Sequence, residues 1–204
     1  MLRPANRRYL LEKRALDVTI CLLLLVFVVP LLLLCILAIR LDTPGPALFT
    51  QDRTGRDGRR FRMLKLRTMV ANAEELKPAL AHLNVLPPPD FKILDDPRIT
   101  RVGRFLRATS LDELPQLWNV LRGDMSIVGP RPTSFAAGSY ELWHTSRLDV
   151  PPGITGLWQI EGRNITSFDQ RLRLDMEYIR RRSVPYDLVL IARTAGVVFK
   201  RSGA

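Results

Sequence analysis

The chain has 204 residues, which is enough to bury a hydrophobic core and short enough that we expect one domain. Its formal net charge of +11 predicts an anionic partner: nucleic acid, anionic lipid or a phosphorylated small molecule. Both cysteines lie in one apolar segment, the two histidines are isolated, and no Cys-x-x-Cys pair occurs, so the sequence argues against a zinc site and a disulfide.

The first clear element is the apolar segment 18–39, which contains 22 consecutive uncharged positions. A straight helix of this length, rising about 1.5 Å per residue, just crosses a bilayer. No small-residue cleavage site follows it, so it is not a cleaved signal peptide. Pro30 lies near its middle, where a proline removes a backbone hydrogen bond and bends the helix.

Basic residues flank this segment on both sides, and basic flanks stay on the cytoplasmic side of a membrane. They are Arg3, Arg7, Arg8, Lys13 and Arg14 before it, and Arg40, Arg53, Arg56 and Arg59 after it. We therefore expect a re-entrant helix that is broken at Pro30 and returns to the cytoplasmic face. The alternative is an ordinary spanning helix with a mild proline kink, which membranes tolerate.

The next elements are short. Residues 42–46 form an exit turn, and two alternating runs at 47–51 and 60–66 predict a hairpin closed around Asp57-Gly58. Lys65 and Arg67, taken alone, indicate a solvated basic strand end. Residues 70–86 and 98–106 have helical patterns, and a spacing of three places Arg98, Arg101, Arg104 and Arg107 on one face, against lipid head groups or the site.

Two adjacent acids follow at Asp112 and Glu113, in a basic neighbourhood. One interpretation is structural: Ser110-x-x-Glu113 fits a capping box, and acids are favoured in a first helical turn. The other is functional, because a helix N-terminus attracts phosphate and would keep Asp112 ionised and nucleophilic. Arg131, held between two prolines, is suited to clamp two oxygens of an anion.

The C-terminal part begins with a glycine-rich loop at 151–164, which lacks a nucleotide-binding spacing. We expect it to present Gln159 and Arg163 as substrate- or phosphate-binding residues. Residues 169–182 predict an amphipathic basic helix, and 188–199 predict a second apolar helix that is too short to span. Both suit the membrane interface, and packing on the core is an equal alternative for the last one.

Taken together, these motifs resemble the bacterial sugar transferase family, the monotopic phosphoglycosyl transferases. The matching blocks, in chain order, are KRALD (13–17), GPALFTQDRTG (45–55), KLRTM (65–69), TSLDELPQLWN (109–119), VGPRP (128–132) and GITGLWQ (153–159). The family's Ser-Pro helix break reads Val29-Pro30 here. The resemblance covers nearly everything from Lys13 onward, and we expect a chain without the extra membrane spans of longer relatives.

The resemblance implies transfer of a sugar 1-phosphate from a UDP-sugar to undecaprenyl phosphate with release of UMP, at the start of exopolysaccharide assembly. It implies that Asp112 forms a covalent phosphosugar intermediate, that Glu113 holds Mg²⁺, and that Lys65, Arg107 and Arg131 bind phosphate. It also implies a re-entrant helix broken at Pro30. The expected location is the cytoplasmic face of the bacterial inner membrane.

The expected fold is α+β and mainly helical, with the re-entrant helix, a small β-hairpin and interfacial amphipathic helices around a catalytic helix. Residues 1–42 would form the membrane-associated part and residues 43–204 the catalytic portion, integrated into one domain. The oligomeric state is open, with a homodimer as one alternative.

Two other functions remain as alternatives. One is a non-catalytic membrane-anchored module that binds anionic lipid or nucleic acid. We do not expect nucleic acid, because no binding motif is present and the tryptophans are not interleaved with the basic runs. The other is a membrane diphosphatase, which would use water in place of the lipid phosphate.

Overall fold

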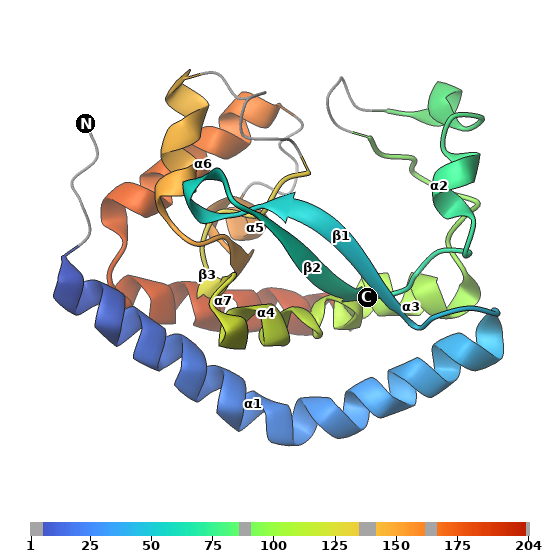
Figure 1. Ribbon diagram of the computed structural model, residues 1–204, viewed down its shortest axis with the longest axis horizontal. Coiled ribbons are helices and arrows are strands. Elements are labelled where there is room, and N and C mark those ends of the chain that lie inside the picture. Colours follow the sequence, from blue (N-terminus) through green and yellow to red (C-terminus); the bar gives the residue numbers. More distant parts are fainter. Residues whose placement is uncertain (1–5, 86–90, 135–141, 162–166, 203–204) are drawn as a thin grey trace.

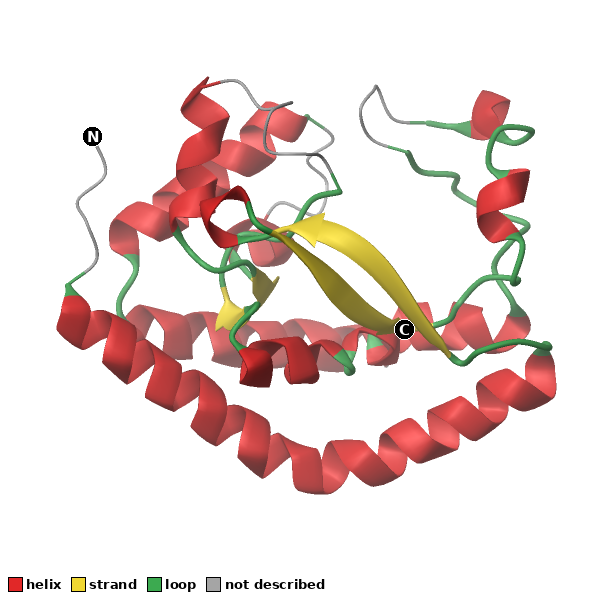
Figure 2. Ribbon diagram, viewed as in Figure 1, coloured by secondary structure: helices red, strands yellow, loops and turns green. Residues whose placement is uncertain are grey.

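The structure, a computed structural model, describes residues 6–85, 91–134, 142–161 and 167–202. Helices dominate this part of the chain, and two small sheets lie among them (Figure 2). The prediction of a mainly helical α+β chain with a small antiparallel hairpin is therefore confirmed.

The longest element is α1 (Arg7–Asp42), whose first turn is capped by the Asn6 side chain. It is long and apolar enough to cross a membrane. Helical structure continues through Pro30, and Figure 1 shows α1 bent in its central part, with its concave side towards the other helices. The large apolar side chains on its exposed face include Leu22, Leu23, Val26, Phe27, Leu33, Leu34 and Leu37. The return of α1 to one membrane face, and a break at Pro30, stay predictions.

Both ends of α1 are fixed to the same body by polar contacts. Near its start, the Lys13 ammonium lies 2.9 Å from the carboxylate of Asp187, which is fully buried. At its end, Asp42 accepts a 3.1 Å hydrogen bond from the backbone N–H of Val102. The two halves of α1 therefore cover one surface of the remaining chain, as Figure 1 shows.

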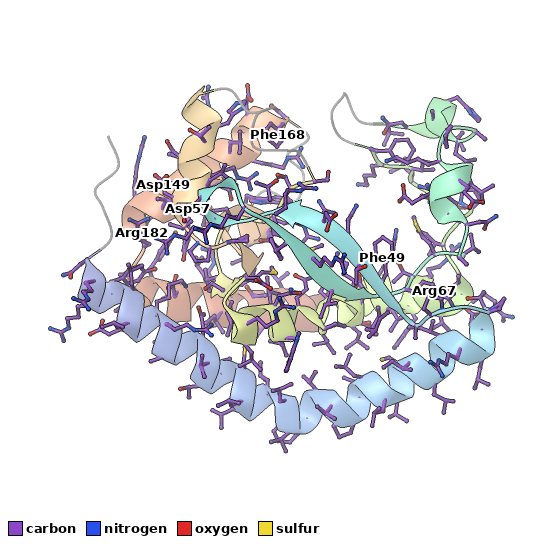
Figure 3. All side chains as sticks on the ribbon, viewed as in Figure 1. Phe49, Asp57, Arg67, Asp149, Phe168 and Arg182 are labelled. Atoms are coloured by element: carbon purple, nitrogen blue, oxygen red, sulfur yellow. The ribbon has the colours of Figure 1, made fainter. Side chains whose placement is uncertain are left out.

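The hairpin pairs β1 (Leu48–Thr54) with β2 (Arg60–Leu66) through the short 3₁₀ helix η1 (Arg56–Gly58). Asp57 adopts a left-handed conformation there (φ 56°), so the turn lies where Asp57-Gly58 predicted it. Directly after β2, Arg67 is buried and donates to the backbone carbonyls of Thr43 and Pro44. It joins the hairpin to the exit from α1 (Figure 3), so the interpretation of Arg67 as a solvated strand end is wrong.

A middle layer lies between α1 and the hairpin (Figure 1). It contains α3 (Arg101–Thr109), the 3₁₀ turn η3 (Leu111–Glu113), α4 (Gln116–Arg122) and α7 (Val184–Ser202). The strand β3 (Ser126–Val128) follows α4 and pairs in parallel with β4 (Gly153–Thr155). Beyond this pair lie η5 (Leu142–Asp149), α5 (Leu157–Glu161) and α6 (Phe168–Arg181).

The core consists of two clusters, and α1 contributes to both. Cys21 and Val28 pack in the larger cluster, and Cys35 and Ile39 pack in the smaller one. Both cysteines are buried and free, which confirms that they act as small apolar residues.

Four expectations were wrong. The helix expected over 70–86 is absent from its described part, residues 70–85, which forms only the short helices α2 (Ala73–Leu76) and η2 (Ala81–Leu83). Arg98 precedes α3 and pairs with Asp96 in a buried position, so it does not extend the arginine face of that helix. The loop 151–164 contains β4 and α5. The apolar face of α6, with Leu172 and Ile179, packs into the core and not against a membrane.

Candidate active site

The two adjacent acids lie in a 3₁₀ turn between two helices. Ser110 ends α3 in a left-handed conformation (φ 60°), and Pro115 directly precedes α4. The Ser110 side chain makes no capping hydrogen bond, and the Glu113 carboxylate points to other partners. The capping-box alternative is therefore wrong, and α4 begins at Gln116, later than the sequence predicted.

Glu113 joins two cations that come from distant parts of the chain. Its Oε1 accepts a 3.1 Å hydrogen bond from Lys65 on β2 and a 2.5 Å hydrogen bond from Arg131, which follows β3. Burial alone would raise the pKa of Glu113, but the charges of Arg131 and Lys65 outweigh burial and lower this pKa to about 2. Glu113 therefore remains a carboxylate at any physiological pH.

The pKa values of the two cations shift in opposite directions. Burial lowers the pKa of the Lys65 ammonium, although the Glu113 charge opposes this shift. The Glu113 charge raises the pKa of the Arg131 guanidinium against the effect of its burial. The Arg131 side chain is still 35% exposed, so this cation lies at a solvent-accessible side of the cluster.

Asp112 is only 8% exposed. Its pKa lies above that of an ordinary aspartate because burial outweighs the favourable charges of Lys65, Arg107 and Arg131. The sequence predicted the opposite shift, since a pattern of nearby arginines does not reveal how deeply the carboxyl group is buried.

Arg107 reaches this region from the last turn of α3. Its Nε donates a 2.9 Å hydrogen bond to the hydroxyl of Thr68, just beyond the end of β2. Gly103 permits this close packing, because a Cβ atom there would lie 2.0 Å from the Thr68 carbonyl oxygen. Asp112 thus lies among three cations from three elements, and the cluster carries more positive than negative charge.

The loop that carries Arg131 is held by buried side chains behind it. Arg147 donates a 2.6 Å hydrogen bond to the backbone carbonyl of Arg131 and pairs with Asp175 of α6 at 2.7 Å. One turn along α6, the Tyr178 hydroxyl donates to the carbonyl of Val128. Arg131 and Arg147 also line a small cleft with Thr54, Gly55, Pro130, Pro132, Thr133, Leu148, Val150 and Pro152.

The sequence of this chain also matches a known protein family. The bacterial sugar transferase family matches residues 8–201, nearly the whole chain. The chain belongs to the bacterial sugar transferase family.

Similar proteins of this family come from several bacteria. The chain is 46% identical over 207 residues to the galactosyl transferase CpsE of Streptococcus agalactiae, covering 96% of this chain and 44% of that protein. It is 45% identical to the UDP-glucose:undecaprenyl-phosphate glucose-1-phosphate transferase of Caulobacter vibrioides, covering 90% of this chain and 68% of that protein. It is 38% identical to the exopolysaccharide production protein ExoY of Sinorhizobium fredii, covering 95% of this chain and 88% of that protein. The chain thus spans less than half of CpsE and most of ExoY.

Gln159 and Pro30, which the sequence also singled out, lie outside this cluster. Gln159 is on α5, where its side-chain amide donates to the carbonyl of Ile154. Arg163 lies outside the described residues. Pro30 lies within the bent helix α1, far from Asp112 and Glu113 in sequence. The structure therefore groups Lys65, Arg107, Asp112, Glu113 and Arg131, and gives Gln159 a local contact.

Sequence reasoning missed two amides on the buried face of α4. Asn119 accepts a hydrogen bond from the backbone N–H of Leu64 and donates to the carbonyl of Arg62, so it fixes α4 to β2 beside Lys65. Gln116 is buried one turn before it. The available signal was the presence of two amides at a spacing of three within an otherwise apolar helix.

The acids of this cluster are also candidate metal ligands. Within the described ranges, no cluster of three or more His, Cys, Asp or Glu side chains could hold an ion. Glu113, which stays ionised, nevertheless fits Mg²⁺, an ion that proteins often bind through one or two carboxylates together with substrate phosphates.

Proposed function

We propose that this protein transfers a sugar 1-phosphate from a UDP-sugar to undecaprenyl phosphate and releases UMP. The observation that carries the proposal is the position of Asp112 and Glu113 among Lys65, Arg107 and Arg131. A non-catalytic lipid-binding module has no need to bury two acids inside a cationic cluster. Similar proteins support the donor and the acceptor, since they include a UDP-glucose:undecaprenyl-phosphate glucose-1-phosphate transferase and an undecaprenyl-phosphate galactose phosphotransferase.

In the first step, an Asp112 carboxylate oxygen attacks the sugar-linked phosphorus of the donor. A new bond between phosphorus and the aspartyl oxygen forms, and the bond to the bridging oxygen breaks. UMP leaves with the electron pair of the broken bond. Arg107 and Arg131 offer positive charge to the phosphoryl oxygens, where charge accumulates during the transfer.

In the second step, an oxygen of the polyprenyl phosphate attacks the same phosphorus atom. The bond to Asp112 breaks, the carboxylate is regenerated, and a polyprenyl diphosphate sugar is formed. Because the nucleophile is restored, one carboxylate can serve both displacements. The burial of Asp112 favours this role, since a weakly solvated carboxylate is more reactive than one surrounded by water.

We further propose that Glu113 holds Mg²⁺ together with diphosphate oxygens of the donor. When bound, the ion supplies positive charge that neutralises the phosphoryl oxygens. Glu113 suits this role because it is ionised over the whole physiological range. Lys65 and Arg131 hold its carboxylate in place from two sides.

We place the protein at the cytoplasmic face of the bacterial inner membrane, with α1 dipping into the bilayer and returning. Contacts at Lys13 and Asp42 tie both ends of α1 to the same body, which supports entry and exit on one side. Exposed apolar side chains on α3, α4 and α7 support an interfacial position for these helices; they are Phe105, Trp118, Leu188 and Val189. Exopolysaccharide assembly is the proposed pathway, in keeping with the similarity to the exopolysaccharide production protein ExoY.

The deciding experiment measures UMP release from a panel of UDP-sugars, including UDP-glucose and UDP-galactose, with Mg²⁺ and undecaprenyl phosphate. We expect sustained release of UMP only when the polyprenyl phosphate is added. Equal and sustained release without it would indicate a diphosphatase. No release with any donor in the panel, together with binding to anionic vesicles, would favour the non-catalytic module.

A further inference from the structure

Gln116 follows Glu113 by three positions at the start of α4, and the proposed mechanism gives it no role. It is the first residue of α4, and the backbone before it is already helical, because Leu114 and Pro115 both adopt right-handed helical conformations. Residues three and four positions apart are neighbours on a helix surface. Gln116 therefore shares a helix face with Glu113 and Asp112.

The side-chain amide of Gln116 is deeply buried but has no partner. Gln116 is 2% exposed, and its Nε2 makes no hydrogen bond within the part of the chain that the structure describes. A buried donor without an acceptor costs stability, and native structures leave few of them. The neighbouring Asn119, also buried on this helix, has both its amide oxygen and nitrogen bonded. Of the two buried amides of α4, only that of Gln116, the one nearer to the acids in sequence, has an unused donor.

Other donors of the cluster already have protein partners. Lys65 and Arg131 donate to Glu113, and the Nε of Arg107 donates to Thr68. Gln116 differs from them in being neutral and uncommitted. An amide N–H that makes no hydrogen bond to the protein can donate to a phosphoryl oxygen without first breaking another contact.

We propose that Gln116 is a further substrate-binding residue, whose side-chain amide donates a hydrogen bond to an oxygen of the sugar-linked phosphoryl group. This inference rests on the proposed function, because it assigns Gln116 to the phosphorus that Asp112 attacks. The bond would strengthen as charge accumulates on that oxygen, so it would act on the rate of transfer more than on donor binding.

The test is Gln116→Met, which keeps the length of the side chain and removes the donor. The inference predicts opposite effects on stability and on activity. The Tm should rise, because the unpaired buried amide is gone. The expected rise is about 2–4 °C for each kcal/mol that its removal adds to the free energy of unfolding. The rate of UMP formation in the first half-reaction should fall about 100-fold, which is the usual cost of losing one preorganised donor.

Asn119→Leu is the matched control, since it removes a buried amide whose partners are known. Its Tm should fall, because Leu64 and Arg62 lose their side-chain partner. If Gln116→Met lowers the Tm or fails to fold, the amide has a structural partner and the inference is overturned.

The activity measurement separates this inference from the proposed function. If the wild-type protein forms UMP and Gln116→Met forms it at a rate within threefold of wild type, the inference fails and the proposed function stands. If the wild-type protein forms no UMP from any UDP-sugar, both fail together. A gain in Tm combined with a large loss of rate is the outcome that supports the role of Gln116.

Discussion

The guanidinium of Arg147 donates to the backbone carbonyl of Arg131 while it pairs with the buried carboxylate of Asp175. An arginine used for phosphate binding must be held at a defined position, because small displacements of a charge weaken its effect on the reacting group. The contact acts on the backbone and leaves the Arg131 side chain free to bind Glu113. Arg147 is therefore a positioning residue for Arg131.

Arg147→Met should raise the KM for the UDP-sugar and lower stability. Breaking a buried ion pair by removing one partner typically costs about 3–5 kcal/mol, because the other charge is left unpaired. The double variant Arg147→Met/Asp175→Asn removes that charge and should recover part of the Tm. Its KM should remain raised, since the contact to Arg131 is still missing. A double variant with a wild-type KM would contradict this positioning role.

Glu113→Gln should abolish Mg²⁺-dependent turnover while the fold is retained. Glutamine keeps the shape and can still accept a hydrogen bond from Lys65 or Arg131, but it removes the charge that both cations face. The measurement is UMP release over a range of Mg²⁺ concentrations, with circular dichroism as the check on folding. Activity close to wild type in this variant would exclude Glu113 as the metal-binding residue.

Asp112→Asn should eliminate the covalent intermediate and lower turnover by several orders of magnitude. The amide is nearly isosteric but is not a nucleophile, whereas the loss of a purely structural acid costs only about 1 kcal/mol of stability. Wild-type protein is incubated with a labelled UDP-sugar without polyprenyl phosphate, and the peptide containing Asp112 is analysed by mass spectrometry. A phosphosugar adduct on a different residue would refute the assignment.

The pH dependence of the first half-reaction should report the environment of Asp112. Burial raises the pKa of Asp112. As the pH falls, Asp112 therefore becomes protonated, and loses its reactive carboxylate form, at a higher pH than an ordinary aspartate does. The acid limb of kcat/KM, which reflects the free enzyme, should therefore lie above pH 3.8. Lys65→Met removes a charge that lowers this pKa, so it should move the limb to still higher pH. An unshifted limb in this variant would contradict the electrostatic coupling of Lys65 to Asp112.

The topology of α1 can be tested with single cysteines introduced near residues 8 and 55, in a background where Cys21 and Cys35 are replaced by alanine. Both sites should react only from the cytoplasmic side. Pro30→Ala restores a helical hydrogen bond and should place a fraction of molecules in a spanning orientation. Labelling of one wild-type site from the periplasm would refute the re-entrant arrangement.

The sequence predicted regular elements and site residues well where the local pattern was strong. The hairpin at Asp57-Gly58, the helices α6 and α7, and the grouping of Lys65, Asp112 and Arg131 followed from turn residues, periodicity and family motifs. It failed where tertiary contacts decide the outcome. Residues 70–86 had a helical pattern, but the described part of this stretch, residues 70–85, forms only two short helical turns. The burial that raises the pKa of Asp112 comes from the packing of distant elements.

The contribution of α1 to both core clusters has a consequence for how the protein is made. Without residues 1–42, the fully buried Asp187 would lose the Lys13 ammonium, and both core clusters would lose the side chains that α1 contributes, including Cys21 and Cys35. We expect such a truncated chain to aggregate. Deleting α1 therefore cannot serve to produce a shortened, folded form of this protein, because the same helix that carries the exposed apolar face also completes the core.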